Sequence, residues 1–208
     1  MPLVLAAAAT STLSAVDIST AMQHYPSWAL LDERSAAALM DVMTNPSGVT
    51  TYCKVIPLVG DEKLATEFCT LLKRAKVKPA HLANGEAVHG WTHGIYKMCI
   101  PDTTIGDQIC ALHSAPDYTL TVNFLPEGAT GQVGKLILAV DANGVVTDCQ
   151  PTMGVDKTLL PAAVCKWPAL SPQPVRQNAA GLPVPYVTAV RIELVVFLLP
   201  STSTPATH

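Results

Sequence analysis

The chain contains an internal repeat. The stretch GVTTYC, residues 48–53, returns as GVVTDC at residues 144–149, displaced by 96 positions. Sliding the chain by the same 96 positions aligns ten identical residues over positions 48–88 without a gap. Chance would give about two or three identities, so we interpret the pattern as an internal duplication. In the first copy the identities are Gly48, Val49, Thr51, Cys53, Val59, Leu64, Cys69, Ala83, Gly85 and Val88.

Each copy follows the same local pattern of an apolar run, a turn ending in glycine, a second run, a helix and a last strand. The turn is Asn45–Gly48 in the first copy and Asp141–Gly144 in the second. Its glycine supplies the positive φ that a hairpin loop needs. Asp61 can cap the first helix, whose apolar residues recur at helical spacing. Asp156 or Thr158 can cap the second.

The repeated unit is therefore ββαβ. The predicted fold class is α+β, with two tandem ββαβ units, each a three-stranded antiparallel sheet packed on one helix. The first unit spans residues 25–100 and the second spans residues 117–200. Residues 101–116 have no clear periodicity and form a connector. An N-terminal segment, residues 1–24, and a tail, residues 201–208, flank the two units.

The second copy carries a series of short glycine- and proline-based motifs. They comprise a hairpin with a glycine turn, a helix starting near leucine and ending at tryptophan, a proline loop, a G-x-P-V motif and a long last strand. The residues are Gly144, Leu159, Leu160, Trp167, Pro174, Gly181-Leu182-Pro183-Val184 and the run Val187 to Leu199. Together they resemble the C-terminal domain of TonB-family energy transducers, and the first copy matches more loosely. Many bacterial members of that family carry cysteines at positions matching Cys149 and Cys165.

The resemblance implies a periplasmic domain that binds other proteins. Full transducers also have a membrane-spanning N-terminus and a long Pro-rich spacer, and neither is present in this sequence. We therefore expect a non-enzymatic protein-binding module rather than an energy transducer. Two alternatives stay open: an enzyme of unfamiliar type with a cleft between the two units, and a fragment of a membrane-anchored transducer.

The last strand is the candidate binding edge. In a three-stranded sheet two strands have an open edge, and an open edge can accept another chain as an added strand. The run Val187 to Leu198 is long for so small a sheet, and TonB-like domains are similar in using their last strand for binding. The predicted edge for a protein partner or a homodimer is Val187, Ala189, Val190, Arg191, Ile192 and Glu193. Cover by the other unit of the same chain is the alternative.

The six cysteines are best interpreted as three disulfides. The predicted pairs are Cys53–Cys69, Cys149–Cys165 and Cys99–Cys110. The first two pairs have the same spacing and tie the second strand of each unit to its helix, whereas the third brackets the connector. A closed loop of about fifteen residues contributes about 3 kcal/mol in the entropic model. Reduced core cysteines in a cytoplasmic protein are the alternative.

Other functional classes find little support in the sequence. The formal charge is −3 and no basic stripe suggests nucleic acid as a partner. No P-loop, G-x-G-x-x-G or G-x-S-x-G motif is present, so we predict no cofactor and no catalytic residues. No cysteine pair has metal-ligand spacing. His89 and His93 lie four apart in a stretch leading into a strand, about 13 Å by rise alone, and an exposed loop is the expected role.

The N-terminus is open to two interpretations. Leu3 to Ala9 is an apolar run, and Leu13-Ser14-Ala15 has the small residues of a cleavage site. The positive residues of a complete signal peptide are missing, so the segment is either a trimmed signal peptide or an Ala-rich chain end. The run is shorter than the roughly 20 residues that span a bilayer. The expected location is the bacterial periplasm, without a transmembrane segment.

Overall fold

The computed structural model describes residues 12–19, 24–123, 125, 131–152 and 162–196. The helices are α2 (Ser27–Leu31), α3 (Glu62–Arg74), α4 (Thr104–Cys110) and the 3₁₀ helices η2 (Ala162–Lys166) and η3 (Pro168–Leu170). The strands are β1 (Ala36–Thr44), β2 (Thr50–Gly60), β3 (Ala80–His81), β4 (Ala87–Met98), β5 (Tyr118–Val122), β6 (Gly131–Val140), β7 (Val146–Thr152) and β8 (Tyr186–Val196).

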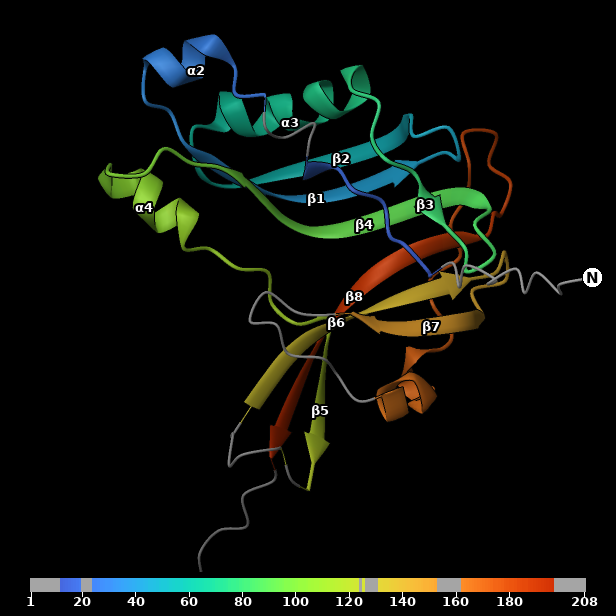
Figure 1. Ribbon diagram of the computed structural model, residues 1–208. Coiled ribbons are helices and arrows are strands. Elements are labelled where there is room, and N and C mark those ends of the chain that lie inside the picture. Colours follow the sequence, from blue (N-terminus) through green and yellow to red (C-terminus); the bar gives the residue numbers. More distant parts are fainter. Residues whose placement is uncertain (1–11, 20–23, 124, 126–130, 153–161, 197–208) are drawn as a thin grey trace, which may run out of the picture.

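The strands of the described residues form one mixed sheet, so the prediction of two separate three-stranded sheets is wrong, although the α+β class holds. The main strand order is β2-β1-β4-β8-β6-β7, and β3 and β5 pair with β4 and β8. The last strands of the two units, β4 and β8, run parallel and pair at residues 89–91 with 186–188 (Figure 1). Each unit alone would leave the edge of its last strand unpaired, and this short contact fills part of both edges.

The sequence repeat reappears as a repeat of strand pairing. Val42 faces Cys53 in the β1–β2 pair, and Leu138 faces Cys149 in the β6–β7 pair, each displaced by 96. A register irregularity next to the hairpin turn is displaced by the same amount. The β1–β4 and β6–β8 registers also agree at this offset. The duplicated sequence therefore builds duplicated pairing within a shared sheet.

The two hairpin turns have the same hydrogen bonds. Oδ1 of Asn45 accepts the backbone N–H groups two and four residues later, both at 3.0 Å. Oδ1 of Asp141 accepts the corresponding two groups at 2.8 Å. Gly48 and Gly144 end these turns with φ values of +77° and +85°. A positive φ is readily accessible only to glycine, which explains why this residue is repeated.

The helices differ more than the strands. Oδ1 of Asp61 accepts the N–H of Leu64 at 2.8 Å, so the predicted cap of α3 is confirmed. In the second unit the described part of the predicted helix is the pair of 3₁₀ helices η2 and η3. The predicted caps Asp156 and Thr158 lie outside the described residues. Proline at residue 168 cannot sit inside an α-helix, and here it begins η3.

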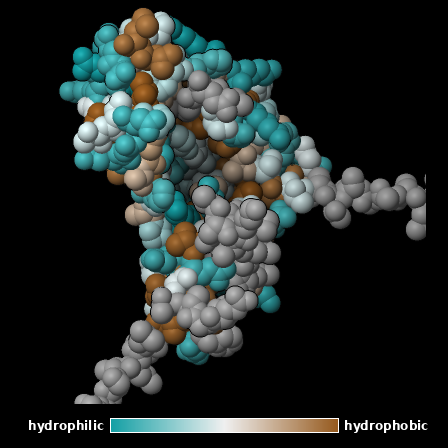
Figure 2. Space-filling model, turned by 60° about the vertical axis from the view of Figure 1, so that its left-hand side comes forward, coloured by the Kyte–Doolittle hydropathy of each residue, from teal (hydrophilic) through white to brown (hydrophobic). Residues whose placement is uncertain are grey.

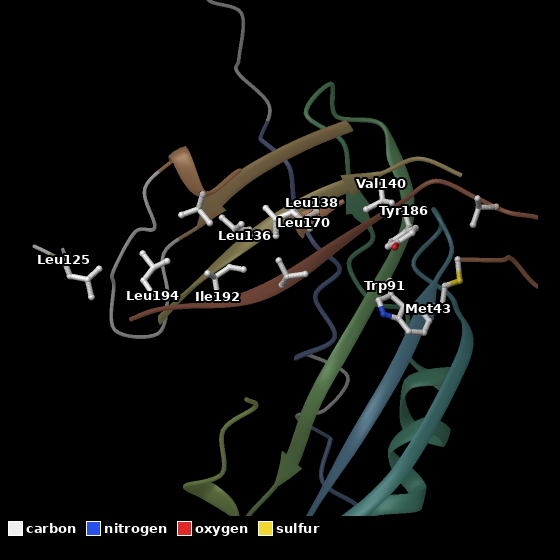
Figure 3. Close-up of a cluster of buried hydrophobic side chains, with 13 residues drawn as sticks. Met43, Trp91, Leu125, Leu136, Leu138, Val140, Leu170, Tyr186, Ile192 and Leu194 are labelled. Atoms are coloured by element: carbon white, nitrogen blue, oxygen red, sulfur yellow. The ribbon is translucent and has the colours of Figure 1, made fainter. Parts of the chain in front are cut away.

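The two units bury opposite faces of the shared sheet. In β1, Val42 packs in the cluster beneath α3, whereas its neighbour Met43 packs in the cluster of the second unit. Successive side chains of a strand point to opposite faces, so these two clusters lie on opposite sides. Trp91 of β4 joins Met43 near Tyr186 (Figure 3). In Figure 1, α3 lies above the sheet and residues 162–170 lie below it.

Part of the N-terminal segment belongs to the folded body. Ser14 and His81 exchange two backbone hydrogen bonds, at 3.1 and 3.0 Å, and Asp17 N–H donates to the Lys78 carbonyl at 3.2 Å. The Leu13 side chain is buried. This segment therefore lies beside residues 78–81, held by two isolated antiparallel bridges. The apolar run predicted as a possible signal peptide, residues 3–9, lies outside the described residues.

The connector contains structure that its sequence did not suggest. It carries α4, whose N-terminus is capped by Thr103, with its Oγ1 accepting the Gly106 N–H at 3.1 Å. Strand β5 follows and pairs parallel to β8. Within the described chain, none of the helices combines the length and the apolar character that a membrane crossing requires.

Candidate functional site

All three predicted disulfides are present, and the prediction of disulfide bonding is confirmed. The structure pairs Cys53 with Cys69, Cys99 with Cys110, and Cys149 with Cys165. No cysteine is free. Disulfides are typical of proteins that fold in oxidising compartments, outside the cell or in the periplasm. The chain is therefore assigned to such a compartment.

The predicted binding edge is not open, which corrects the sequence-based expectation. On one side β8 pairs with β6 from residue 186 to residue 195. On the other side it pairs with β4 at its start and with β5 from residue 192 onward. Between them Arg191 donates its N–H to Asp117 Oδ2 at 2.6 Å and accepts the Asp117 N–H at 2.8 Å.

The side chains of this strand are also covered. Among the predicted edge residues, Val187, Val190 and Ile192 are buried, and Ala189, Arg191 and Glu193 are half-buried. Val190 and Ile192 contribute to the core of the second unit. Intramolecular cover, the alternative weighed from the sequence, is therefore what the structure contains.

An open edge is found at β2 instead. This strand ends the sheet, is 11 residues long, and pairs with β1 alone among the described strands. Alternate side chains Tyr52, Ile56 and Leu58 are 44%, 45% and 49% exposed. They lie away from Cys53 and Val55, which pack toward α3. An apolar row beside an unpaired backbone is the combination that strand addition uses.

The hydrogen bonds of β4 indicate which backbone groups of β2 point away from β1. The Ile95 N–H donates to Ser114 Oγ at 2.8 Å, so it points away from β1. Backbone direction alternates in antiparallel pairs, so Leu39, opposite Ile95, directs its groups toward Ile56 of β2. The N–H and C=O of Val55, the preceding residue, then point outward to solvent.

The other end of the sheet is a weaker candidate. Strand β7 is seven residues long and carries Pro151, which has no N–H to donate. Strand β2 also carries a proline, Pro57, but a longer run, residues 51–56, precedes it. Proline is tolerated on edge strands because the missing donor would face solvent. The longest uninterrupted edge is therefore that of β2.

A cavity of about 580 Å³ lies between the two units. It opens where β4 and β8 diverge after their short parallel contact. Its lining is mainly apolar and comes from both units and from the N-terminal segment. The principal residues are Val16, Ile18, Trp91, Ile95, Tyr96, Lys97, Lys135, Ile137 and Ala189. Figure 2 shows the surface hollowed between the part that carries the helices and the part that carries β5.

Three polar groups in this cavity are fixed by hydrogen bonds. The Lys97 ammonium donates to the carbonyls of Cys110 and Leu112, the latter at 2.7 Å. The Tyr96 hydroxyl lies 2.5 Å from a threonine hydroxyl, and burial raises the pKa of this phenol. The Asp17 carboxylate accepts hydrogen bonds from Ser19, which lower its pKa and keep it ionised at neutral pH.

The two histidines lie in β4, so the expectation of an exposed loop is wrong. Nδ1 of His93 lies 2.5 Å from Oδ1 of Asp41, directly across the β1–β4 pair. Burial lowers the pKa of His89. Among the residues whose placement is described, no group of three or more His, Cys, Asp or Glu side chains is arranged to hold a metal ion.

No protein-family model, no curated protein and no solved structure matches the chain. The resemblance of the second copy to TonB-family domains therefore stays a prediction. Strand β2 and the cavity between the units are the two places where the geometry bears on function. Neither was identified from the sequence: in TTYCKVIPLV apolar residues fall on both faces of the strand, so no period-two pattern distinguishes the exposed row.

Proposed function

We propose that the chain is a non-enzymatic protein-binding module of the bacterial periplasm that binds its partner by strand addition at β2. The observation that carries the proposal is the open 11-residue edge of β2 with its exposed apolar row. An extended segment of the partner would pair with the outward backbone groups and cover those side chains. The site differs from the edge predicted on β8, which is occupied within the chain.

The disulfides support the compartment in this proposal. Two of them connect the terminal strands β2 and β7 to the helical segments packed on them. The Cys53–Cys69 bond therefore holds the proposed edge against α3 before any partner arrives. A pre-formed edge lowers the ordering cost of binding. The resemblance to TonB-family C-terminal domains agrees with a periplasmic protein-binding role.

The exposed side chains of β2 indicate which kind of partner segment would bind there. The exposed row is apolar and aromatic at Tyr52, Ile56 and Leu58, with the single charge of Lys54 between them. A complementary segment alternates apolar side chains on the side that faces this row. An acidic side chain opposite Lys54 would add a cross-strand ion pair. The expected partner is thus an extended, mainly apolar segment with an acidic residue.

The test is a pull-down from bacterial periplasmic extract with the full disulfide-bonded chain as bait, followed by hydrogen exchange on the complex. We expect a captured protein to slow amide exchange at Cys53 and Val55, whose N–H groups face solvent in the free chain. Val55→Pro removes one of these donors and should weaken capture about tenfold or more. Ile56→Glu should act similarly by placing a charge in the apolar row.

Val145→Glu is the matched control for the charge. Val145 is 48% exposed and lies in the β6–β7 turn, at the opposite end of the sheet from β2. Capture should be unchanged in this variant, and circular dichroism should show all variants folded. A captured partner that leaves β2 exchange unchanged and binds Val55→Pro normally would rule out this edge as the binding surface.

A further inference from the structure

The cavity between the units has the size and lining of a small-molecule site. Its volume of about 580 Å³ falls within the range of about 300–1,000 Å³ that is usual for ligand sites. Trp91, Ile95, Tyr96 and Ile137 give it an aromatic and aliphatic wall. Such a wall suits the apolar body of a ligand, and it is formed by both units together.

Lys135 lines one side of the cavity, and Arg191 lies beside it on the same face of the sheet. Lys135 of β6 and Arg191 of β8 are directly opposite each other in the antiparallel pair. In such a pair the Cβ atoms lie about 4.5–5.5 Å apart, and like charges destabilise the sheet. Neither side chain forms an ion pair or side-chain hydrogen bond with any residue that the structure describes. An anion placed between them would remove the repulsion.

Three carboxylates lie near these two cations without forming an ion pair with either. Asp117 uses Oδ2 to accept the Arg191 backbone N–H, and Glu193 accepts the Thr119 hydroxyl at 3.4 Å. The Asp17 carboxylate in the cavity wall accepts hydrogen bonds from Ser19 and is attracted to Lys78. These carboxylates offset part of the positive charge, but the charged groups of Lys135 and Arg191 have no ion-pair partner within the described residues.

A third cation stands on the opposite wall. Lys97 of β4 uses two of its three protons for the carbonyls of Cys110 and Leu112. It is held in place by neutral acceptors, and no carboxylate within the described residues pairs with it. Its positive charge is therefore available to a ligand without first breaking an ion pair.

We propose that this cavity binds a small amphipathic anion, with its apolar body against Trp91, Ile95 and Ile137 and its anionic head at Lys135 and Arg191. The proposal is independent of partner binding at β2, which lies at the end of the sheet. A bound anionic head lowers the repulsion between Lys135 and Arg191, so a ligand of this class also stabilises the β6–β8 pair. A neutral ligand of the same shape would lose this contribution.

The experiment is isothermal titration calorimetry on the full disulfide-bonded chain with decanoate as the probe. Decanol and decyltrimethylammonium have the same tail with a neutral and a cationic head. We expect saturable 1:1 binding of decanoate and at least about tenfold weaker binding of the other two, a difference of about 1.4 kcal/mol or more. Lys135→Gln should reduce decanoate affinity about tenfold. Lys73→Gln, an exposed charge on α3, is the matched control and should change nothing.

A steric variant locates the site. Ala189→Phe fills part of the cavity from β8 and should abolish decanoate binding, and Ala15→Phe does the same from the N-terminal segment if the first variant fails to fold. The proposal is overturned if decanoate does not bind. It is also overturned if all three probes bind equally, or if binding survives Lys135→Gln and both steric variants unchanged.

Discussion

At the scale of single residues, the repeated glycines are required for two different reasons. Gly48 and Gly85 both have positive φ values, +77° and +84°. A Cβ at Gly48 would lie 2.1 Å from the Val77 carbonyl oxygen, whereas a Cβ at Gly85 would meet nothing within 4 Å. Gly144 repeats the close approach against Gln173, at 2.2 Å. One glycine of each copy is therefore needed for its backbone conformation alone, and the other for space as well.

This difference predicts two unequal losses of stability. Gly85→Ala should cost about 1–2 kcal/mol, the strain of a left-handed residue. Gly48→Ala must also displace the Val77 carbonyl, so we expect about 3–4 kcal/mol. Urea unfolding of the two variants and the parent chain measures both values. Equal losses would show that the turn relaxes and that contact with Val77 has no role.

The Asp141 turn predicts a pH dependence that its counterpart lacks. Hydrogen bonds from the backbone N–H groups of Val145 first, and also of Asn143, hold the Asp141 pKa below its ordinary value of 3.8. A lowered pKa gives stability that is present above pH 3.8 and is lost as the pH falls through the folded-state pKa. Asn45 makes the same bonds in the first copy without a titrating group.

Asp141→Asn should therefore lose less stability than the parent between about pH 5 and about pH 2. Urea midpoints at the two pH values give the comparison. Asp32→Asn, which removes an exposed carboxylate outside the turn, is the control and should follow the parent. Equal acid losses in the parent and in Asp141→Asn would contradict a special role of the Asp141 carboxylate.

At the scale of elements, short sequence motifs correctly predicted the features that depend on local interactions. The hairpin turns, the cap at Asp61 and the order of strands and helix follow from residues close together in the chain. The disulfide pairs were predictable because Cys53–Cys69 recurs as Cys149–Cys165 at the same spacing. Strand β5, by contrast, was missed although YTLTV alternates apolar and polar residues after Pro116-Asp117. Its parallel pairing with the distant strand β8 is not encoded locally.

The union of the two sheets could not be predicted from either copy. The register that joins β4 to β8 involves three residues of each strand, and nothing in their sequences specifies a parallel neighbour. The sequence indicated that the last strand pairs either with a partner or within the same chain. It could not distinguish a partner from the chain itself, because both satisfy the same backbone groups.

Neither candidate site could be predicted from local sequence. The exposed row of Tyr52, Ile56 and Leu58 does not stand out, because Cys53 and Val55 on the other face are apolar as well. Its importance depends on β2 being the terminal strand, which is a property of the assembled sheet. The cavity unites Lys97 with Lys135, residues of different copies that no local pattern connects.

At the scale of the whole molecule, the two units are coupled without a covalent link between them other than the chain. Each disulfide joins cysteines within one unit or within the connector region. Coupling therefore depends on the shared sheet and on Trp91. The Trp91 side chain packs in the core of the second unit, and the Arg176 guanidinium lies 3.5 Å over its ring. Unfolding one unit would expose the apolar surface of the other.

We therefore predict a single cooperative unfolding transition. Trp28 lies against the first core, where its ring contacts Lys63, and Trp167 packs edge-to-face with Tyr118 in the second core. Two variants each retain one of these tryptophans and carry phenylalanine in place of the other two tryptophans of the chain. Their fluorescence in urea reports the unfolding of each unit separately. The two midpoints should coincide, because probes of a two-state transition agree.

Trp91→Ala tests the source of this cooperativity. Removing a buried aromatic side chain costs about 3–5 kcal/mol, and here the loss falls on the contact between the units. Alanine in place of the phenylalanine at position 91 of both single-tryptophan chains should lower both midpoints and separate them, since each unit keeps its own disulfide and most of its own core. Two distinct midpoints in the chains without this change would show that the units unfold independently and that the shared sheet does not couple them. Coincident but lowered midpoints after Trp91→Ala would instead assign the coupling to the β4–β8 backbone pairing.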